Sequence, residues 1–194
     1  MKNKSIITLA VAILLIVVLP ACRDNSKGSQ SSTSTTTQEK GQTVDDAMPA
    51  APSFPLLDMV GILNQKDSIE ISKKIKELDS LKLAQVAVVI TDDLKGMDVK
   101  DYATKLGNNW GVGHKETNNG ITIVVKPKKD DTPEGGGKAA IATGSGMEKI
   151  ITNDMCKRII QEEMVPEFKQ DKYGEAIEDA LDKIKDILTG DKDK

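Results

Sequence analysis

Three short apolar runs dominate the hydrophobic pattern of the chain between residues 84 and 144. They read AQVAVVIT (Ala84–Thr91), GITIVV (Gly120–Val125) and AAIATG (Ala139–Gly144). Each run is rich in β-branched or small apolar residues and is too short for a typical helix, so each predicts a strand. The first run is continuous rather than alternating, which is typical of a strand buried on both faces.

Between and around these runs, apolar residues recur every three or four positions, which predicts amphipathic helices. Asn64, Asp98 and Thr152 are good N-cap residues for three of them. Gly111 ends the second helix, and Pro166 closes the third. The side chains that define the apolar faces are Ile71, Ile75, Leu78, Val99, Tyr102, Ala103, Leu106, Trp110, Cys156, Ile159, Ile160, Met164, Tyr173, Ile177, Leu181, Ile184 and Leu188.

The order of these elements predicts the fold. A helix lies between the first two strands, so these strands should be parallel and joined by a right-handed crossover. The Pro/Gly/charge-rich loop from Lys126 to Lys138 is interpreted as a solvated hairpin tip, which makes the third strand antiparallel. The predicted fold class is α/β, a three-layer α/β/α sandwich with a small mixed β-sheet flanked by helices on both faces.

The first residues predict an exported protein. Lys2 and Lys4 precede an apolar run from Ile6 to Leu19, which is short for a membrane span and typical of a signal peptide. The run ends in LPAC, which resembles a bacterial lipoprotein signal, so we expect cleavage before Cys22 and lipidation of Cys22 by acyl chains such as palmitate. An uncleaved anchor and an ordinary secretory signal are the alternatives.

These boundaries give the domain organisation. Residues 1–21 are the predicted signal peptide, residues 22–52 a flexible Ser/Thr-rich tether, and residues 53–190 one folded domain. The expected localisation is the cell envelope, where Cys22 anchors the protein to a bacterial membrane. The sequence leaves the choice between inner and outer membrane open.

Composition narrows the classes of partner. The chain has 27 Lys and Arg against 30 Asp and Glu, a net charge of −3, and 3% aromatic residues. It therefore lacks the basic face and the stacking platform that nucleic-acid binding uses. If Cys22 carries lipid, Cys156 has no disulfide partner, and its place on an apolar helix face indicates a core residue rather than a nucleophile.

One edge of the predicted sheet gathers candidate site residues. The helix that ends at Trp110 and the hairpin should bring residues 113–120 and 143–149 to the amino-terminal edge of the second strand. We also expect the segment that contains Asp58 at this edge. Oxygen ligands on Gly-rich loops suit Ca²⁺. The predicted cation ligands are Asp58, Asn118, Asn119 and Glu148, and the predicted pocket residues are Trp110, Gly113, Gly144 and Gly146.

Structural roles are the alternative for the same residues. Asp58 would cap a backbone turn, Asn119 would supply turn geometry, and Glu148 would favour a helix start. Trp110 would close the apolar stripe of its helix at the edge of the core. His114 is interpreted as an exposed loop residue. Asp92 and Asp93 follow the first strand and mark a second, weaker candidate site.

From Asp58 to Leu188 the chain resembles the TPM domain family, a module shared by many bacterial envelope proteins and a thylakoid-lumen branch. The matching segments are QVAVVIT, DYATKLGNNWGVG, NNGITIVV, TGSGMEKIIT and RIIQEEMVPEFKQDKYGEAI, with Asp58, Gly61 and Leu63 before them. Many relatives have an Asn-Asp pair where this chain has Leu57 and Asp58, and the loop from Pro127 to Gly137 is longer than usual. The resemblance implies Ca²⁺ binding and phosphatase activity, which are associated with some branches.

Two functions follow as hypotheses. In the first, the lipoprotein displays its domain to bind a protein partner, with Ca²⁺ assistance, in envelope or membrane-protein maintenance. In the second, the same edge is a metal-assisted acid phosphatase that acts on phosphomonoesters. A phosphatase needs a nucleophile or a metal-activated water, and no strong nucleophile stands out in the sequence, which favours the first.

Overall fold

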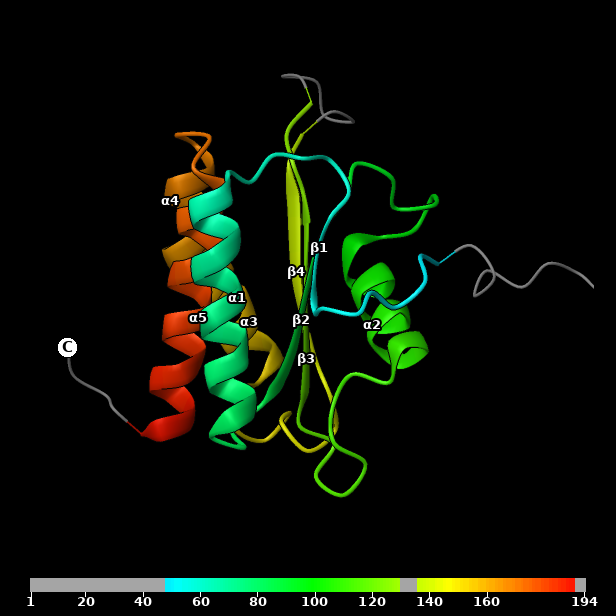
Figure 1. Ribbon diagram of the computed structural model, residues 1–194, viewed down its shortest axis with the longest axis vertical. Coiled ribbons are helices and arrows are strands. Elements are labelled where there is room, and N and C mark those ends of the chain that lie inside the picture. Colours follow the sequence, from blue (N-terminus) through cyan, green and yellow to red (C-terminus); the bar gives the residue numbers. More distant parts are fainter. Residues whose placement is uncertain (1–47, 130–135, 191–194) are drawn as a thin grey trace, which may run out of the picture. The chain divides into compact units, whose positions relative to one another are not determined.

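The computed structural model describes residues 48–129 and 136–190 of the 194-residue chain. These residues build one sheet in the order β1 (Leu56–Asp58), β2 (Gln85–Ile90), β3 (Gly120–Lys126) and β4 (Lys138–Thr143). The first three strands are parallel, and β4 is antiparallel to β3. Helices cover both faces of the sheet (Figure 1), so the predicted mixed sheet in a three-layer sandwich is confirmed.

The two helical layers are unequal. One face carries α1 (Gln65–Ser80), α3 (Asn153–Ile159), a π-helix η2 (Ile160–Met164), α4 (Val165–Phe168) and α5 (Tyr173–Thr189). The other face carries α2 (Val99–Trp110) (Figure 1). Residues 48–55, which we call the N-terminal strap, run along the α2 side before β1 begins.

The predicted helix starts are confirmed in their capping bonds. The side chain of Asn64 accepts a hydrogen bond from the backbone N–H of Asp67 at 3.0 Å. Asp98 accepts one from the N–H of Lys100 at 2.9 Å. Thr152 caps α3 in the same way. These short polar side chains satisfy N–H groups that have no partner inside the helix.

Pro166 does not close the third predicted helix, which corrects the sequence interpretation. The N–H of Val165 bonds to the carbonyl of Ile160, five residues back, so the helix widens into η2 before α4 continues it. Pro166 then lies in the first turn of α4, directly after the wider turn, so the helix continues past the proline. The change of helix type also leaves Ile160 half-buried, while Met164 is fully buried.

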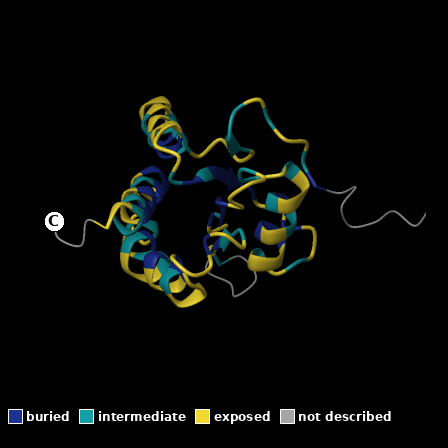
Figure 2. Cartoon of the chain, turned by 90° about the horizontal axis from the view of Figure 1, so that it is seen from below, coloured by how far each residue is buried: buried dark blue, intermediate teal, exposed yellow. Residues whose placement is uncertain are grey.

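Two apolar layers hold the domain together, and Figure 2 shows the buried residues concentrated on the strands and on the inner sides of the helices. Alternate residues of β2 and β3 point to opposite faces, so both strands are buried on both sides. The layer under α1, α3 and α5 includes Ile71, Ile75, Leu78, Val86, Val88, Ile121, Ile123, Ile159, Ile177, Leu181 and Ile184. The smaller layer under α2 includes Met48, Val89, Leu94, Tyr102, Ala103, Leu106, Val124 and Ala140.

The strand β1 was not predicted. Its three residues pair with Val88–Ile90, and the N–H of Val88 donates to the carbonyl of Pro55 at 2.7 Å. Three residues are too few to give a recognisable alternation, so sequence reasoning treated them as a connection to the first helix. As a result the predicted place of this segment, at the amino-terminal edge of the second predicted strand, is wrong. It runs parallel to β2 and ends beside Ile90, at the carboxyl edge of the sheet.

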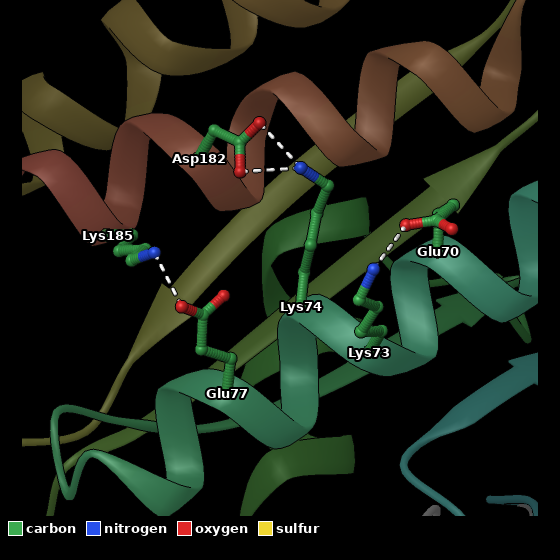
Figure 3. A network of polar contacts seen from close by, with 6 residues as sticks. All are labelled: Glu70, Lys73, Lys74, Glu77, Asp182 and Lys185. Atoms are coloured by element: carbon green, nitrogen blue, oxygen red, sulfur yellow. Dashed lines mark hydrogen bonds and ion pairs between the residues drawn. The ribbon is translucent and has the colours of Figure 1, made fainter.

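Helices α1 and α5 lie side by side and carry ion pairs across their exposed surface (Figure 3). The ammonium group of Lys74 contacts both carboxylate oxygens of Asp182 at 2.7 and 2.6 Å. Lys185 contacts Glu77 at 2.7 Å. Exposed pairs of this kind stabilise a protein by at most about 1 kcal/mol each. The apolar contact between the helices is therefore the main attraction, and the ion pairs help to fix their register.

Several predictions about the N-terminus lie outside the described residues. The signal peptide 1–21, Cys22 and residues 22–47 of the tether belong to this group. The end of the predicted tether is described and packs on the domain, because Met48 is 8% exposed within the layer under α2. Within residues 48–129 and 136–190, no helix combines the length and apolar character needed to cross a membrane.

Glu178 on α5 makes the stability of the fold depend on pH. Burial raises the pKa of this carboxyl above its ordinary value of 4.5, and the carboxylates of Asp67 and Glu70 add to the rise against the opposing effect of Lys74. The folded state therefore holds the proton more tightly than the unfolded chain. Stability falls as pH rises from about 4.5 through the raised pKa.

We predict that Glu178→Gln increases the free energy of unfolding at pH 7. The gain should shrink as pH falls below the ordinary carboxyl pKa, because the wild-type side chain is then protonated in both states. Urea denaturation at several pH values measures this. Glu175→Gln is the matched control, since it removes a carboxylate paired with Lys172 at 2.8 Å and should not stabilise. Equal, pH-independent effects of both variants would contradict the prediction.

Candidate functional site

A groove of about 360 Å³ lies between the strap, α1, the amino-terminal half of β2 and the end of α2. Its apolar lining includes Phe54, Ile75, Val86, Trp110 and Val112. Its polar lining includes Ser53, Lys76, Asp79 and Gln85. A mostly apolar concave surface with a few polar groups is the usual form of a binding site in proteins.

The groove exists because β1 is shorter than β2. Pairing between them begins at Leu56 and Val88, so residues 85–87 have no strand beside them on that side within the described chain. Pro55 has no N–H and cannot donate to the carbonyl of Val86, which stops the ladder at this point. Alternate residues of a strand direct their backbone groups to the same side. The backbone N–H and carbonyl of Val86 therefore point toward the groove, just as the N–H of Val88 points toward Pro55.

Trp110 connects the strap to α2 and lines the groove. Its indole Nε1 donates to the carbonyl of Pro49 at 2.8 Å. Its ring packs at the margin of the layer that also contains Met48 and Tyr102. The residue thus combines the two interpretations of the sequence, since it closes the apolar stripe of its helix and also forms a wall of the groove.

The opposite wall carries a cation–aromatic contact. The ammonium group of Lys76 lies 4.7 Å from the centre of the Phe54 ring. Such a contact is attractive because the ring face is electron-rich. It joins α1 to the strap, so both long walls of the groove include strap contacts.

The loop that follows α2 is fixed to the groove end of β2 and α1. The N–H of Gly113 donates to Gln85 Oε1 at 2.6 Å. The ring nitrogen Nε2 of His114 lies 3.0 Å from Asp79 Oδ1, and both side chains are partly exposed. This pair was missed, because Asp79 belongs to the polar face of a helix and lies 35 residues before the histidine. No periodic signal links two such positions.

The two predicted loop segments, residues 113–120 and 143–149, lie side by side, as the hairpin topology predicts. The N–H of Gly144 donates to the carbonyl of Gly120 at 2.8 Å, and that of Gly146 to the carbonyl of Asn118 at 3.2 Å. Asn119 is 5% exposed. Its side chain accepts from the N–H of His114 at 3.0 Å and donates to the carbonyl of Leu83 at 3.4 Å. Glu148 is exposed on the neighbouring loop.

Asp58 is not at this edge, so the predicted convergence with Asn119 and Glu148 is wrong. Asp58 pairs with Ile90 at the carboxyl end of β2, whereas Gly120 pairs with Gln85 at the other end. Its carboxylate accepts hydrogen bonds from three backbone N–H groups. The donors are Val60 at 3.1 Å, Gly61 at 2.8 Å and Leu63 at 2.9 Å. The alternative role of Asp58, a cap of a backbone turn, is the one observed.

The four predicted ligands therefore do not fit a single Ca²⁺ ion. Asp58 lies at the other edge, and Asn119 uses both ends of its side-chain amide in protein hydrogen bonds. Asn118 and Glu148 remain exposed on adjacent loops. In the described part of the chain, no group of three or more His, Cys, Asp or Glu side chains is arranged to hold a metal ion.

The predicted pocket glycines allow close packing instead of lining the groove. A Cβ at Gly144 would collide with the carbonyl oxygen of Asn118, and one at Gly146 with that of Thr117. Gly113 has a φ of 113°, and a Cβ there would lie 2.7 Å from the backbone nitrogen of Gly120. These glycines let the loop after α2 and the loop after β4 approach at backbone distance.

The remaining reactive candidates have structural surroundings. Cys156 is 4% exposed, and burial raises the pKa of its thiol, which disfavours the reactive thiolate. Asp93 lies 2.6 Å from the ammonium group of Lys95, and this hydrogen-bonded cation lowers the pKa of the carboxyl. Asp92 and Asp93 follow β2 at the carboxyl edge of the sheet. Asp58 lies at the same edge, and the groove lies at the other end of β2, near Gln85.

Comparison with known families decides the membership of the chain. The family model described as the TPM domain matches residues 56–187. The chain belongs to the TPM domain family. No protein of curated function matches the chain.

Two solved structures are similar to this TPM domain. The solution structure of the N-terminal domain of a protein from P. gingivalis has 22% sequence identity and a TM-score of 0.63, over 76% of this chain and 92% of that one. The solution structure of the N-terminal domain of a protein from Corynebacterium glutamicum has 12% identity and a TM-score of 0.53, over 71% and 81% of the two chains. At these identities the likeness concerns the fold alone.

The TPM resemblance also singled out position 57, and the structure explains the residue found there. Leu57 is partly buried and packs against the layer under α2, next to the strand that contains Val89. An apolar side chain suits that position. Asp58, the next residue, points its carboxylate into the turn that follows β1.

We predict that Asp58→Ala lowers the free energy of unfolding by about 1–2 kcal/mol, because three backbone N–H groups lose their acceptor. Two of these groups lie at an exposed turn, where water can replace the carboxylate and limits the loss. Thermal and urea denaturation measure the loss. Asp92→Ala, at an exposed position of the same edge, is the control and should leave stability nearly unchanged. An Asp58→Ala variant as stable as the control would show that the turn does not depend on its carboxylate.

Proposed function

We propose that this TPM protein is a membrane-anchored envelope lipoprotein whose domain binds a protein partner in the groove. The observation that carries the proposal is the half of β2, residues 85–87, that forms a groove floor without a neighbouring strand. A partner segment in extended conformation matches such a floor, because it can add main-chain contacts along a strand. The anchor favours partners that maintain the envelope or its membrane proteins.

The walls of the groove support a protein occupant. Trp110 and Phe54 provide aromatic surface, and aromatic residues are enriched where proteins bind each other. Lys76 and Asp79 add one charge of each sign at the same groove. This combination suits a mostly apolar segment with polar groups at its ends, and it gives such a segment a preferred direction.

The anchor in the proposal is lipidated Cys22. Acyl chains on one cysteine add about 0.8 kcal/mol for each buried methylene, and more than one chain is needed for stable anchoring. A flexible tether of roughly 25 residues has an average reach of about 25–30 Å. The groove would then sample proteins close to the membrane surface.

Photo-crosslinking tests the site directly. A photoreactive residue at Ser53, which is exposed and lines the groove, should crosslink to a defined envelope protein in living cells. The same residue at Ser145, which is exposed outside the groove lining, is the matched control and should not give this product.

Val112→Asp, introduced with the Ser53 crosslinker, should abolish the product, because it places a charge in the apolar wall while leaving the bond between Trp110 and Pro49 intact. Circular dichroism checks that the variant is folded. Equal crosslinking from Ser53 and Ser145, or a product that survives Val112→Asp, would contradict the groove as the docking site. Metal-dependent hydrolysis of a generic phosphomonoester, lost in Glu148→Ala, would favour phosphatase chemistry instead.

The proposal includes Ca²⁺ as an assisting ion at the loops of Asn118 and Glu148, two exposed residues on loops that the backbone bond from Gly146 to Asn118 joins. We predict that Ca²⁺ raises the melting temperature and that Glu148→Ala removes this rise. Asp58→Asn should keep the rise, because that side chain lies at the other edge. Differential scanning fluorimetry with and without Ca²⁺ measures both, and a rise lost only in Asp58→Asn would move the ion to the carboxyl edge.

A further inference from the structure

The turn after β1 exposes three large apolar side chains within four consecutive positions. Met59 is 53% exposed, Val60 41% and Ile62 36%. We call residues 59–62 the apolar turn. Single exposed apolar residues are ordinary on a protein surface, but a contiguous group marks an interaction site.

Hydrogen bonds hold the apolar turn in its exposed form. The three bonds to the Asp58 carboxylate fix the backbone from Val60 to Leu63. The N–H of Met59 donates to the carbonyl of Ile90 at 2.9 Å, which continues the β1 ladder into the turn. The apolar side chains are therefore presented to solvent by a braced backbone, and little conformational entropy would be lost when they become buried elsewhere.

Charges around the turn are nearly balanced. The carboxylate of Asp58 is engaged by backbone donors, and Lys66 follows on the first turn of α1. In the neighbouring connection after β2, Lys95 is paired with Asp93, and Asp92 is exposed. A partner that meets the turn thus meets apolar side chains with charges of both signs beside them.

We propose that the apolar turn inserts into the interface of the membrane that anchors the protein. The choice of a bilayer as occupant rests on the lipid anchor proposed above. Residues 22–47 separate the proposed anchor from the described domain, and a tether of this length would keep the domain close to the same surface. Insertion of the three apolar side chains then orients the domain on that surface.

The orientation has a consequence for the groove. The apolar turn lies at the carboxyl end of β2, beside Ile90, while the groove lies at the amino end, around Gln85. With the carboxyl edge on the bilayer, the amino end of β2 and the groove beside it point away from the membrane. The turn would therefore present the groove to partners, which a flexible tether alone would not do.

Vesicle flotation of a chain of residues 23–194 tests the turn without acylation. This chain lacks Cys22 and keeps the whole described core, residues 48–190. It should float with phosphatidylcholine vesicles, and Met59→Ser/Val60→Ser/Ile62→Ser should weaken the partition coefficient by about tenfold or more. The control Leu81→Ser/Ile150→Ser removes side chains that are 53% and 48% exposed outside the turn, and it should leave flotation unchanged.

Addition of phosphatidylglycerol or of about 0.5 M salt should change flotation little, because insertion is apolar. The proposal is overturned if the wild-type chain does not float, if the control loses as much binding as the turn variant, or if binding requires anionic lipid and disappears in salt. Thermal denaturation of both variants confirms that they are folded.

Incorporation of labelled palmitate into the full chain and into Cys22→Ala tests the anchor separately. Loss of the label in the variant supports the anchor and with it the choice of occupant. Absence of label from the wild-type chain would remove the anchor of the proposed function, and flotation alone would then decide whether the turn binds lipid.

Discussion

The need to cover both faces of β2 and β3 determines most of this structure. Both strands are buried on both sides, and α1, α3 and α5 cover one side fully. The twelve-residue α2 leaves part of the other side to the strap, whose Met48 completes that layer. The bond from Trp110 to Pro49 holds the strap there. A chain that must pass along the α2 side cannot also pair with the first half of β2, so the groove follows from the way the sheet is covered.

The parts of the fold that local chemistry determines could be predicted from sequence. Continuous β-branched runs identify three strands, and Asn64, Asp98 and Thr152 mark helix starts because their side chains bond within three residues of themselves. The hairpin loop predicts the antiparallel return of β4. The π-helix is different. η2 packs against α5, a long-range contact that local sequence signals do not report, and Pro166 indicated a helix end where the helix only widens.

The candidate site was predictable only in part, because its geometry depends on the direction in which each segment runs along the sheet. The approach of the loops at Asn118 and Gly146 follows from one crossover and one hairpin, both of which have strong sequence signals. The position of Asp58 depends on whether three residues pair with β2 and in which direction, and three residues carry no periodic signal. The pair of His114 with Asp79 depends on the end of α1 meeting a loop, so it also lay beyond local patterns.

Parallel pairing gives the two edges of the sheet different chemistry and separates them. The six residues of β2 extend about 20 Å at about 3.3 Å each. At one end the chain leaves β1 in a short braced turn, because Asp58 satisfies the backbone donors that no strand can reach. At the other end β1 has not yet begun, so apolar residues of the strap and α2 form a concave surface. One short strand thus produces a projecting apolar turn at its end and a groove before its start. The turn and the groove therefore lie at opposite ends of β2, and neither uses the backbone groups of the other.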